Sequence, residues 1–284
     1  MIGRDGAPSR STARNVTIGL TSAVFVATTL AAPAPLAANE RHFTYTYESA
    51  VLPAGARELE LWSTFRSGRT SFYSRLDQRA EFEVGLSDRL MTAFYLNWRD
   101  VATQDPATGD AVSSFQWDGI SSEWKYKLSD PVADRLGAAL YGEVSLGTRA
   151  FEIESKLILD KRVGSNLFAY NLVLDGEWER QPGGTDLDEV GLEHNLAWTH
   201  FFQPRLAAGL EVRSHTAFTS QHRPEYSALF AGPVISYTGQ SWWVALTALG
   251  QLPAIKRSVD QPNQRLVLDD HERVNVRVLF SYEW

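Results

Sequence analysis

The 284-residue chain contains no cysteine, which fits a protein that is exported unfolded through an oxidising compartment. Long apolar runs are also missing from most of it, and the mean hydropathy is −0.24. This excludes a bundle of transmembrane helices, because each such helix needs about 20 consecutive apolar residues. Positive charge is in deficit as well, with a net charge of −7 at pH 7. We therefore expect no nucleic-acid partner.

The N-terminus has the parts of a secretory signal peptide. Three arginines lie among the first 14 residues, an apolar stretch follows up to residue 32, and the next six positions are mostly small residues and prolines. We expect residues 1–38 to be a signal peptide that is removed on export. A single helical membrane anchor is the alternative, although Pro33 and Pro35 would break its end.

The remainder of the chain has no helical period. Segments of about ten residues instead alternate apolar and polar side chains, the pattern of a strand with one apolar and one polar face. Turn residues separate these segments. Twelve of them follow one another, at 58–66, 75–86, 90–99, 116–128, 136–146, 151–161, 168–178, 190–198, 206–212, 226–237, 242–251 and 273–284. The segments 226–237 and 242–251 are less regular, being apolar on both faces.

The connections alternate in length. Short turns follow the second, fourth, sixth, eighth and tenth segments, whereas most of the others are longer and polar, at 100–114, 180–187, 217–225 and 252–270. Outer-membrane barrels have this two-sided pattern, with turns in the periplasm and loops outside. A soluble β-sandwich also alternates along its strands but has no reason to alternate its loop lengths. The sequence therefore predicts an all-β fold, an antiparallel up-and-down barrel of about 12 transmembrane strands in the outer membrane of a Gram-negative bacterium.

The segment 75–86 shows how firmly the register is set. Its apolar face would meet lipid, and five charged residues share the opposite face. A slip by one residue would turn all of them outward, and the two arginines alone would cost roughly 4–8 kcal/mol near the bilayer midplane.

The last segment ends on an aromatic residue, with two more at alternate positions before it. We expect Phe280, Tyr282 and Trp284 to form the signal through which the barrel-assembly machinery takes the C-terminal strand. Lipid offers no hydrogen-bond partner to the backbone, so the last strand must meet the first, at 58–66. The expected partners are this machinery and outer-membrane lipids, and a monomer is favoured.

The chain after residue 38 resembles outer-membrane β-barrel families of unknown function that are described as porin- or transporter-like. The matching features are the segment FTYTYE at 43–48, the turn GLSDRL at 85–90, AGP at 231–233 and the aromatic end. Such barrels usually end on Phe, from which Trp284 departs. The resemblance implies the architecture and says little about a substrate.

Enzyme motifs are missing from the sequence. A twelve-stranded outer-membrane phospholipase fold uses His two residues before Ser, and none of the six histidines here has Ser at that position. There is no G-x-S-x-G elbow, H-E-x-x-H metal motif, P-loop or dinucleotide fingerprint. We therefore expect no enzyme activity, cofactor or metal. His194, which alternation places outward between Leu192 and Leu196, leaves a lipid-modifying enzyme as the weakest alternative.

The polar faces of the segments provide the candidate residues of the lumen wall. They are Arg75, Asp77, Arg79, Glu81, Glu83, Glu152, Glu154, Lys156, Asp175, Glu177, Glu193, Glu211, Arg213, Arg273 and Arg277. Carboxylates two residues apart could serve acid–base or metal chemistry, but a barrel lumen normally carries such charges. Twelve strands lie between a barrel of eight, which side chains fill, and one of sixteen, which holds an aqueous channel. A narrow pore or transporter for small solutes is the favoured function, and a closed barrel with a structural or surface-binding role is the alternative.

Residues 39–56, before the barrel at 57–284, contain three aromatic residues between 43 and 47. We expect residues 39–56 to form either a plug inside the barrel or a lead-in on its periplasmic side. As a plug, the aromatic residues would pack inside the barrel against inward apolar residues, expected to be Leu229, Pro233, Ile235, Trp243 and Leu249. Pro233 cannot donate to a ladder, so a bulge or bend is expected near it.

Overall fold

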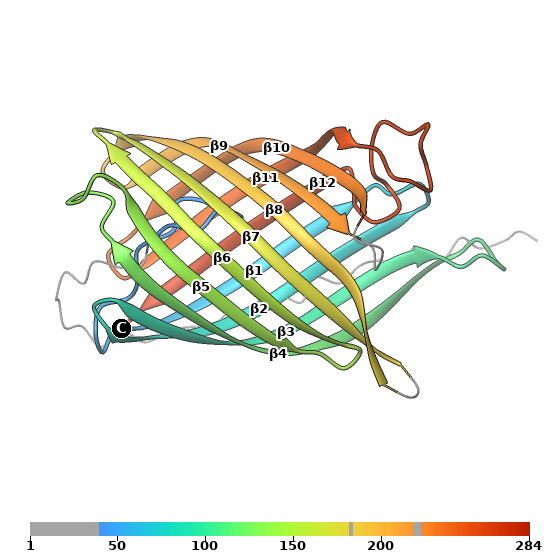
Figure 1. Ribbon diagram of the computed structural model, residues 1–284, viewed down its shortest axis with the longest axis horizontal. Helices are drawn as coiled ribbons and strands as arrows, with labels where there is room; N and C mark the ends of the chain where they lie inside the picture. Colours follow the sequence, from blue (N-terminus) through green and yellow to red (C-terminus); the bar gives the residue numbers. More distant parts are fainter. Residues whose placement is uncertain (1–39, 182–183, 219–222) are drawn as a thin grey trace, which may run out of the picture. The chain divides into compact units, whose positions relative to one another are not determined.

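The computed structural model describes residues 40–181, 184–218 and 223–284, so the expected signal peptide at 1–38 lies outside the described residues. The described chain forms twelve strands, closed into one antiparallel barrel in which β1 pairs with β12 (Figure 1). The strands are β1 (Arg57–Ser67), β2 (Tyr73–Ser87), β3 (Leu90–Gln104), β4 (Ala111–Ser129), β5 (Gly137–Leu146), β6 (Ala150–Val163), β7 (Asn166–Gln181), β8 (Gly184–Gln203), β9 (Leu206–Phe218), β10 (Pro224–Thr238), β11 (Trp242–Lys256) and β12 (Val274–Glu283). The predicted fold class is confirmed. Within the described residues, no helix has the length and apolar character needed to cross a membrane.

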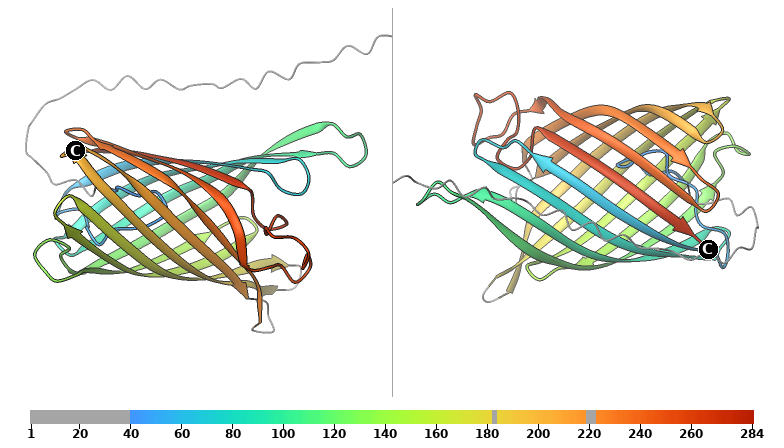
Figure 2. Two further views of the ribbon diagram at one scale, coloured as in Figure 1. Left: turned by 90° about the horizontal axis from the view of Figure 1, so that it is seen from above. Right: turned by 180° about the vertical axis from the view of Figure 1, so that it is seen from behind.

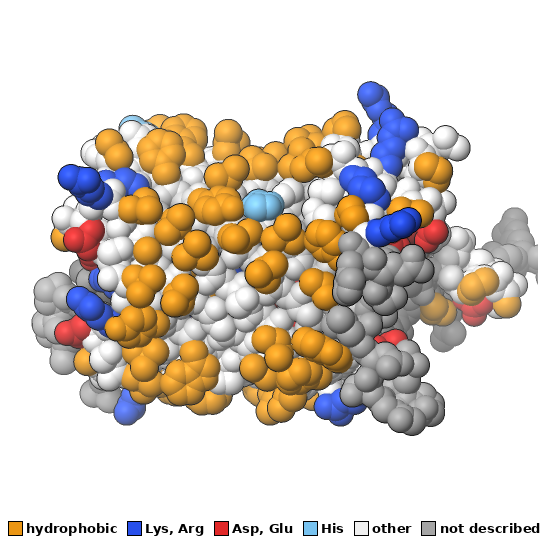
Figure 3. All heavy atoms as spheres, viewed as in Figure 1, with side chains coloured by type: hydrophobic (Ala, Val, Ile, Leu, Met, Phe, Trp, Pro, Cys, Tyr) orange, Lys and Arg blue, Asp and Glu red, His pale blue; other side chains and the backbone are white. Residues whose placement is uncertain are grey.

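Apolar side chains cover the outside of the barrel. Leu61, Phe94 and Leu196 are 45%, 54% and 53% exposed, whereas their sequence neighbours point inward. Figure 3 shows hydrophobic side chains spread over the middle of the barrel, with the charged ones gathered at its two ends. This arrangement suits a wall that meets hydrocarbon in the middle and water at both ends.

The seam between β1 and β12 closes the ring. Their register places Leu61 opposite Phe280, and the backbone N–H of Trp284 donates to the carbonyl of Arg57 at 3.1 Å. The terminal aromatic residues face outward and pack against one another, with the rings of Tyr282 and Trp284 6.2 Å apart. They form part of an aromatic girdle at the end of the barrel that holds the C-terminus and the short turns, the periplasmic end.

Two of the four connections that were predicted to be long loops, at 100–114 and 180–187, are largely continuations of strands, whereas most of the connection at 217–225 does lie between strands. β3 runs to Gln104 and β4 begins at Ala111, and this hairpin projects beyond the other strands (Figure 1). β7 and β8, and likewise β9 and β10, also continue past the predicted ends. The prediction was wrong because a strand beyond the membrane has water on both faces, so backbone pairing continues where the apolar alternation stops. The connection at 257–273 is a true loop, and it buries Val267 and Leu268.

The predicted inward face of β10 is also wrong. Ile235 is 47% exposed and Pro233 is on the same outer face, as is Leu229 by alternation, whereas Phe230 and Val234 are 0% and 2% exposed. Both faces of this strand are apolar, so alternation could not distinguish them. The ladder with β11 skips positions 232 and 233, and the register shift lies further away, between Ser227 and Leu229.

Deleting Tyr282 to Trp284, or the substitution Trp284→Ala, should impair insertion into the outer membrane. Both changes remove the aromatic end of the closing strand, and the deletion also removes seam hydrogen bonds that lipid cannot replace. The measurement is the fraction of protein that reaches the outer membrane in heat-modifiable, folded form. Val259→Ala, in the loop at 257–273 and 62% exposed, serves as the control and should insert normally. Normal insertion of the truncated chain would contradict the assigned role of these residues.

Candidate functional site

We call residues 40–56 the plug. Residues 41–49 are buried inside the barrel, whereas Ala54 and Gly55 are exposed at its end, just before β1 (Figure 2). The three aromatic side chains of the plug are buried, with Phe43 0% exposed and Tyr45 and Tyr47 6% exposed. Each packs into a different apolar cluster of the inner wall. Tyr47 joins one that includes Trp243, and Tyr45 joins one that includes Leu249. The aromatic residues of the plug therefore fill the lumen at several points around its circumference.

Side chains of the wall bind the backbone of the plug. The Glu211 carboxylate accepts hydrogen bonds from the backbone N–H groups of Thr44, Tyr45 and Thr46, at 3.1, 3.0 and 2.8 Å. The Asn171 side chain both accepts from the N–H of Tyr47 and donates to its carbonyl, at 2.6 and 2.9 Å. A buried backbone group must find a partner, and here polar side chains provide it in place of a β-ladder.

The first residues of the plug are held by charge. Arg41, 4% exposed, stacks over the ring of Tyr47 at 4.0 Å, and its Nη1 lies 3.6 Å from Oε1 of Glu60. The His42 Nδ1 atom lies 3.0 Å from a carboxylate oxygen of Glu48. Burial lowers the pKa of His42, but the charge and hydrogen bond of Glu48 outweigh it and raise that pKa overall. Burial raises the pKa of Glu48, and the His42 interactions reverse this to a net lowering.

A cluster of buried carboxylates lies beside the plug on β1 and β2. Glu58 is paired with Glu83 and Glu60 with Glu81 across the two strands. One oxygen each from Glu60, Glu81 and Glu83 lies within 4.8 Å of the others, a spacing that a shared Ca²⁺ ion with bonds of about 2.4 Å would allow. Arg41 already brings a positive charge to Glu60. Among the described residues, this is the one group with the geometry of a metal site.

Between the plug and the extracellular end lies a cavity of about 810 Å³, which we call the vestibule. Tyr45 and Tyr47 of the plug belong to its lining. Its walls carry eight basic and eight acidic side chains, all of them from the barrel. The vestibule is therefore a chamber with charged walls whose inner end is the plug.

Five of the eight basic side chains lie on β12, β1, β2 and β3, and the other three lie on β6, just before it and on β9. Arg66 and Arg75 both pair with Asp77, Arg66 at 2.7 Å. Arg99 pairs with Asp118 at 2.7 Å. Arg277 donates to the hydroxyl of Thr64 at 2.8 Å and stacks over a plug ring, with no carboxylate of the described residues in ion-pair contact.

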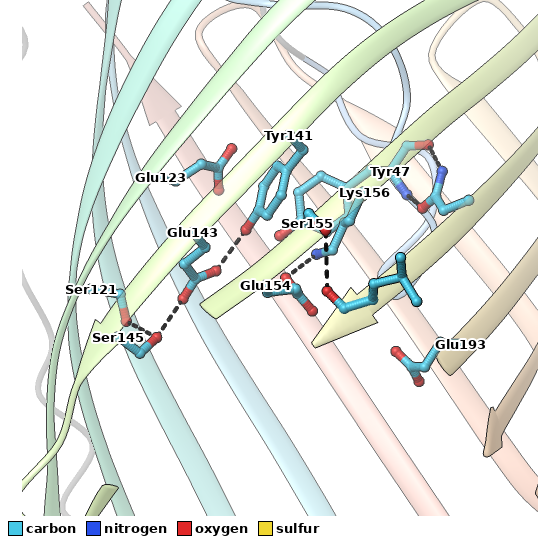
Figure 4. A network of polar contacts seen from close by, with 12 residues as sticks. Tyr47, Ser121, Glu123, Tyr141, Glu143, Ser145, Glu154, Ser155, Lys156 and Glu193 are labelled. Carbon is cyan, nitrogen blue, oxygen red and sulfur yellow. Dashed lines mark hydrogen bonds and ion pairs between the residues drawn. The ribbon is translucent and has the colours of Figure 1, made fainter. Parts of the chain in front are cut away.

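Six of the eight acidic side chains lie on β5 to β8, and the other two lie on β2 and β4. The register places Glu152 opposite Glu177 and Glu154 opposite Asp175. Lys156 pairs with Glu154 at 2.7 Å and stacks over Tyr47. Figure 4 shows this ion pair beside a chain of hydrogen bonds in which Glu143 accepts from Tyr141 at 2.6 Å and from Ser145 at 3.1 Å.

The structure brings most of the sequence-predicted lumen residues together in the vestibule. Those that line it are Arg75, Asp77, Arg79, Glu152, Glu154, Lys156, Glu177, Glu193, Arg213 and Arg277. Asp175 lies on the same wall, next to Gly191. Glu81, Glu83 and Glu211 also point inward but are buried deeper, at the level of the plug.

The prediction that Arg273 lines the lumen is wrong. This residue precedes β12, is exposed, and covers Gly68 at the rim of the barrel instead of lining the lumen. The predicted strand began at residue 273, one position before the start of β12, so the alternation of faces does not apply to this side chain. The sequence pattern does not distinguish the plug anchors Asn171 and Asp160 from the other residues of the polar faces, because charged pairs dominate those faces. Asp160 accepts from the hydroxyl of Ser49 at 2.6 Å.

His194 points outward as predicted. Its Nδ1 atom lies 2.8 Å from the hydroxyl of Tyr170, and the two rings are stacked. A local partner thus accounts for this polar side chain on the apolar face.

The closed ring, apolar outer wall and polar interior define an outer-membrane β-barrel. Within that class, the chain belongs to the Family of unknown function (DUF6662), whose model matches residues 35–284. The family assignment agrees with the resemblance noted in the sequence. No curated protein matches the chain.

Solved structures with little sequence in common share the fold. The COG4313 outer membrane channel from Pseudomonas putida superposes with a TM-score of 0.56 at 14% identity, covering 83% of this chain and 98% of that one. The NanC porin gives 0.52 at 10% identity, covering 79% and 98%. The β-domain of the Bordetella autotransporter BrkA gives 0.50 at 10% identity, covering 82% and 100%.

Glu211→Ala should loosen the plug. The change removes the acceptor of three backbone N–H groups, and each buried group left without a partner costs about 1–3 kcal/mol. The free energy that favours the plug bound in the lumen over the plug released into water therefore falls. We expect faster proteolysis within residues 40–52 of the purified, folded barrel. Glu179→Ala, an exposed carboxylate on the wall, is the matched control and should leave the cleavage rate unchanged. Equal protection in both variants would contradict the anchoring role.

The His42–Glu48 pair should make plug docking depend on pH. The raised pKa of His42 contributes stability that is complete below its ordinary value of 6.5 and is lost as pH rises through the folded value. The lowered pKa of Glu48 contributes stability above 4.5, lost as pH falls through the folded value. Proteolysis of the plug by a protease active across this range should be slowest between pH 4.5 and 6.5. His42→Gln should remove the increase in proteolysis rate above pH 6.5. A variant with the same pH profile as the wild type would contradict the role of this pair.

Proposed function

We propose that the protein is a plugged outer-membrane channel for small polar solutes. The observation that carries this proposal is the way in which the plug is held. Its central backbone is bound by side chains such as Glu211 and Asn171, and it forms no strand with the wall. The plug can therefore leave while every pairing of the barrel stays intact. A charged vestibule on its outer side supports the same proposal, since polar solutes could collect there before passage.

The barrel acts as a monomer in contact with outer-membrane lipids, and the assembly machinery takes its C-terminal strand. It has no enzymatic activity, in keeping with the local Tyr170 partner of His194. The COG4313 protein is described as an outer membrane channel, which supports the reading at the level of the fold.

A closed barrel that binds molecules at its outer surface is the second candidate. It is favoured by the burial of the plug, whose residues from Arg41 to Ser49 are all less than a tenth exposed. The hairpin of β3 and β4 and the loop at 257–273 would then form the binding surface. The two candidates differ in whether the plug ever opens.

Deleting residues 41–53 should open the channel. The wild-type protein should show low or intermittent conductance in a planar bilayer, and the deletion should give a sustained conductance several times higher. The control replaces residues 106–109, at the tip of the β3–β4 hairpin, with two glycines and should behave like the wild type. If the deletion variant is folded but conducts no better, the closed barrel is the correct reading.

A further inference from the structure

We propose that the vestibule selects zwitterionic solutes, which carry an ammonium group at one end and a carboxylate or similar oxyanion at the other. This inference rests on the proposed function, because it names the class of solute that would use the channel. The observation behind it is that most of the basic and most of the acidic side chains lie on opposite sides of the barrel. A closed barrel with the same number of charges could equally well have them mixed.

The two charged walls face each other across the lumen. The strand order of the closed barrel places β7 six positions from β1 in a ring of twelve, so these strands lie on opposite sides. The basic wall is centred on β1 and β2 and the acidic wall on β6 and β7. The lining has as many basic as acidic side chains. A solute with one kind of charge therefore gains from one wall what it loses at the other, whereas a dipolar solute gains from both.

The basic wall retains positive charge after its own ion pairs are formed. Arg66 and Arg75 are directly opposite each other on β1 and β2 and share one carboxylate, that of Asp77. Arg277 adds a second positive charge that contacts oxygen atoms of Thr64 and Thr44 and the ring of Tyr45. Two guanidinium groups with planar, forked donors are well suited to bind an oxyanion.

The acidic wall retains negative charge in the same way. Glu152 and Glu177 are opposite each other, and Glu154 and Asp175 form the next such pair. Like charges at opposed positions destabilise a sheet. Three cations line this side of the vestibule, Arg149, Lys156 and Arg213, against six carboxylates on β5 to β8. Lys156 is paired with Glu154 and stacked on aromatic rings, and Arg213 is paired with Glu193. A solute ammonium group held by Glu152 and its neighbours would relieve this repulsion.

The test compares four probes of one chain length on the purified full-length protein. They are 6-aminohexanoate, 1,6-diaminohexane, hexanedioate and uncharged hexanamide, and binding is measured by titration calorimetry. The zwitterion should bind at least tenfold more tightly than each of the other three. If the diamine or the dicarboxylate binds as tightly, one wall acts alone and the proposal is wrong.

Charge variants separate recognition from folding. Glu152→Gln and Arg75→Gln should each reduce affinity for 6-aminohexanoate at least fivefold, whereas Asp110→Asn, exposed at the hairpin tip, should not change it. Glu152→Lys should reverse the order, so that hexanedioate binds more tightly than 6-aminohexanoate. A variant that merely disturbs packing would weaken all the probes together, and that result would overturn the proposal.

Swelling of liposomes that contain the plug-deleted protein separates this inference from the proposed function. If that channel conducts but all four probes bind and enter alike, the solute class is wrong and the channel stands. If the zwitterion binds selectively but the deletion opens no channel, the binding site stands and transport is wrong.

Discussion

The fold of this protein depends on the requirement that a sheet in lipid leaves no backbone group unpaired. Hydrocarbon offers no hydrogen-bond partner, so the first and last of the twelve strands have to meet. Closure then separates the side chains into two environments. Those that alternate outward must be apolar, and those that alternate inward are free to be charged.

Closure also creates a lumen that must be filled or left open. The inner wall of twelve strands does not fill it alone, and the plug occupies a large part of it with three aromatic side chains in three separate clusters. A segment without strand pairing brings unpaired backbone groups into the interior. Glu211, Asn171 and Asp160 provide partners for them, so the lumen is blocked by contacts that are independent of the barrel's own ladder.

The charges of the inner wall show a second separation, around the ring instead of through the wall. Direct ion pairs such as Arg66–Asp77 and Lys156–Glu154 neutralise part of each side. The remaining guanidinium groups and carboxylates face each other across a cavity large enough for a small solute. The cavity therefore has as many basic as acidic side chains, but most of the positive and most of the negative charges lie on opposite sides of it.

The amino-acid pattern alone was enough to predict the twelve strands, their register in the membrane and the seam between β1 and β12, because lipid on one face imposes a strict two-residue alternation. It could not determine the inner face of β10, where Phe230 and Ile235 are equally apolar, nor the hairpin of β3 and β4, where water meets both faces. The aromatic residues Phe43, Tyr45 and Tyr47 left a plug and a periplasmic lead-in both open, and their burial in the structure decides for the plug. The sequence does not predict the anchors of the plug, because Glu211 and Thr44 are 167 residues apart. Only the closed ring brings such residues together, and only the ring decides that the charges on β1 and β2 face those on β6 and β7.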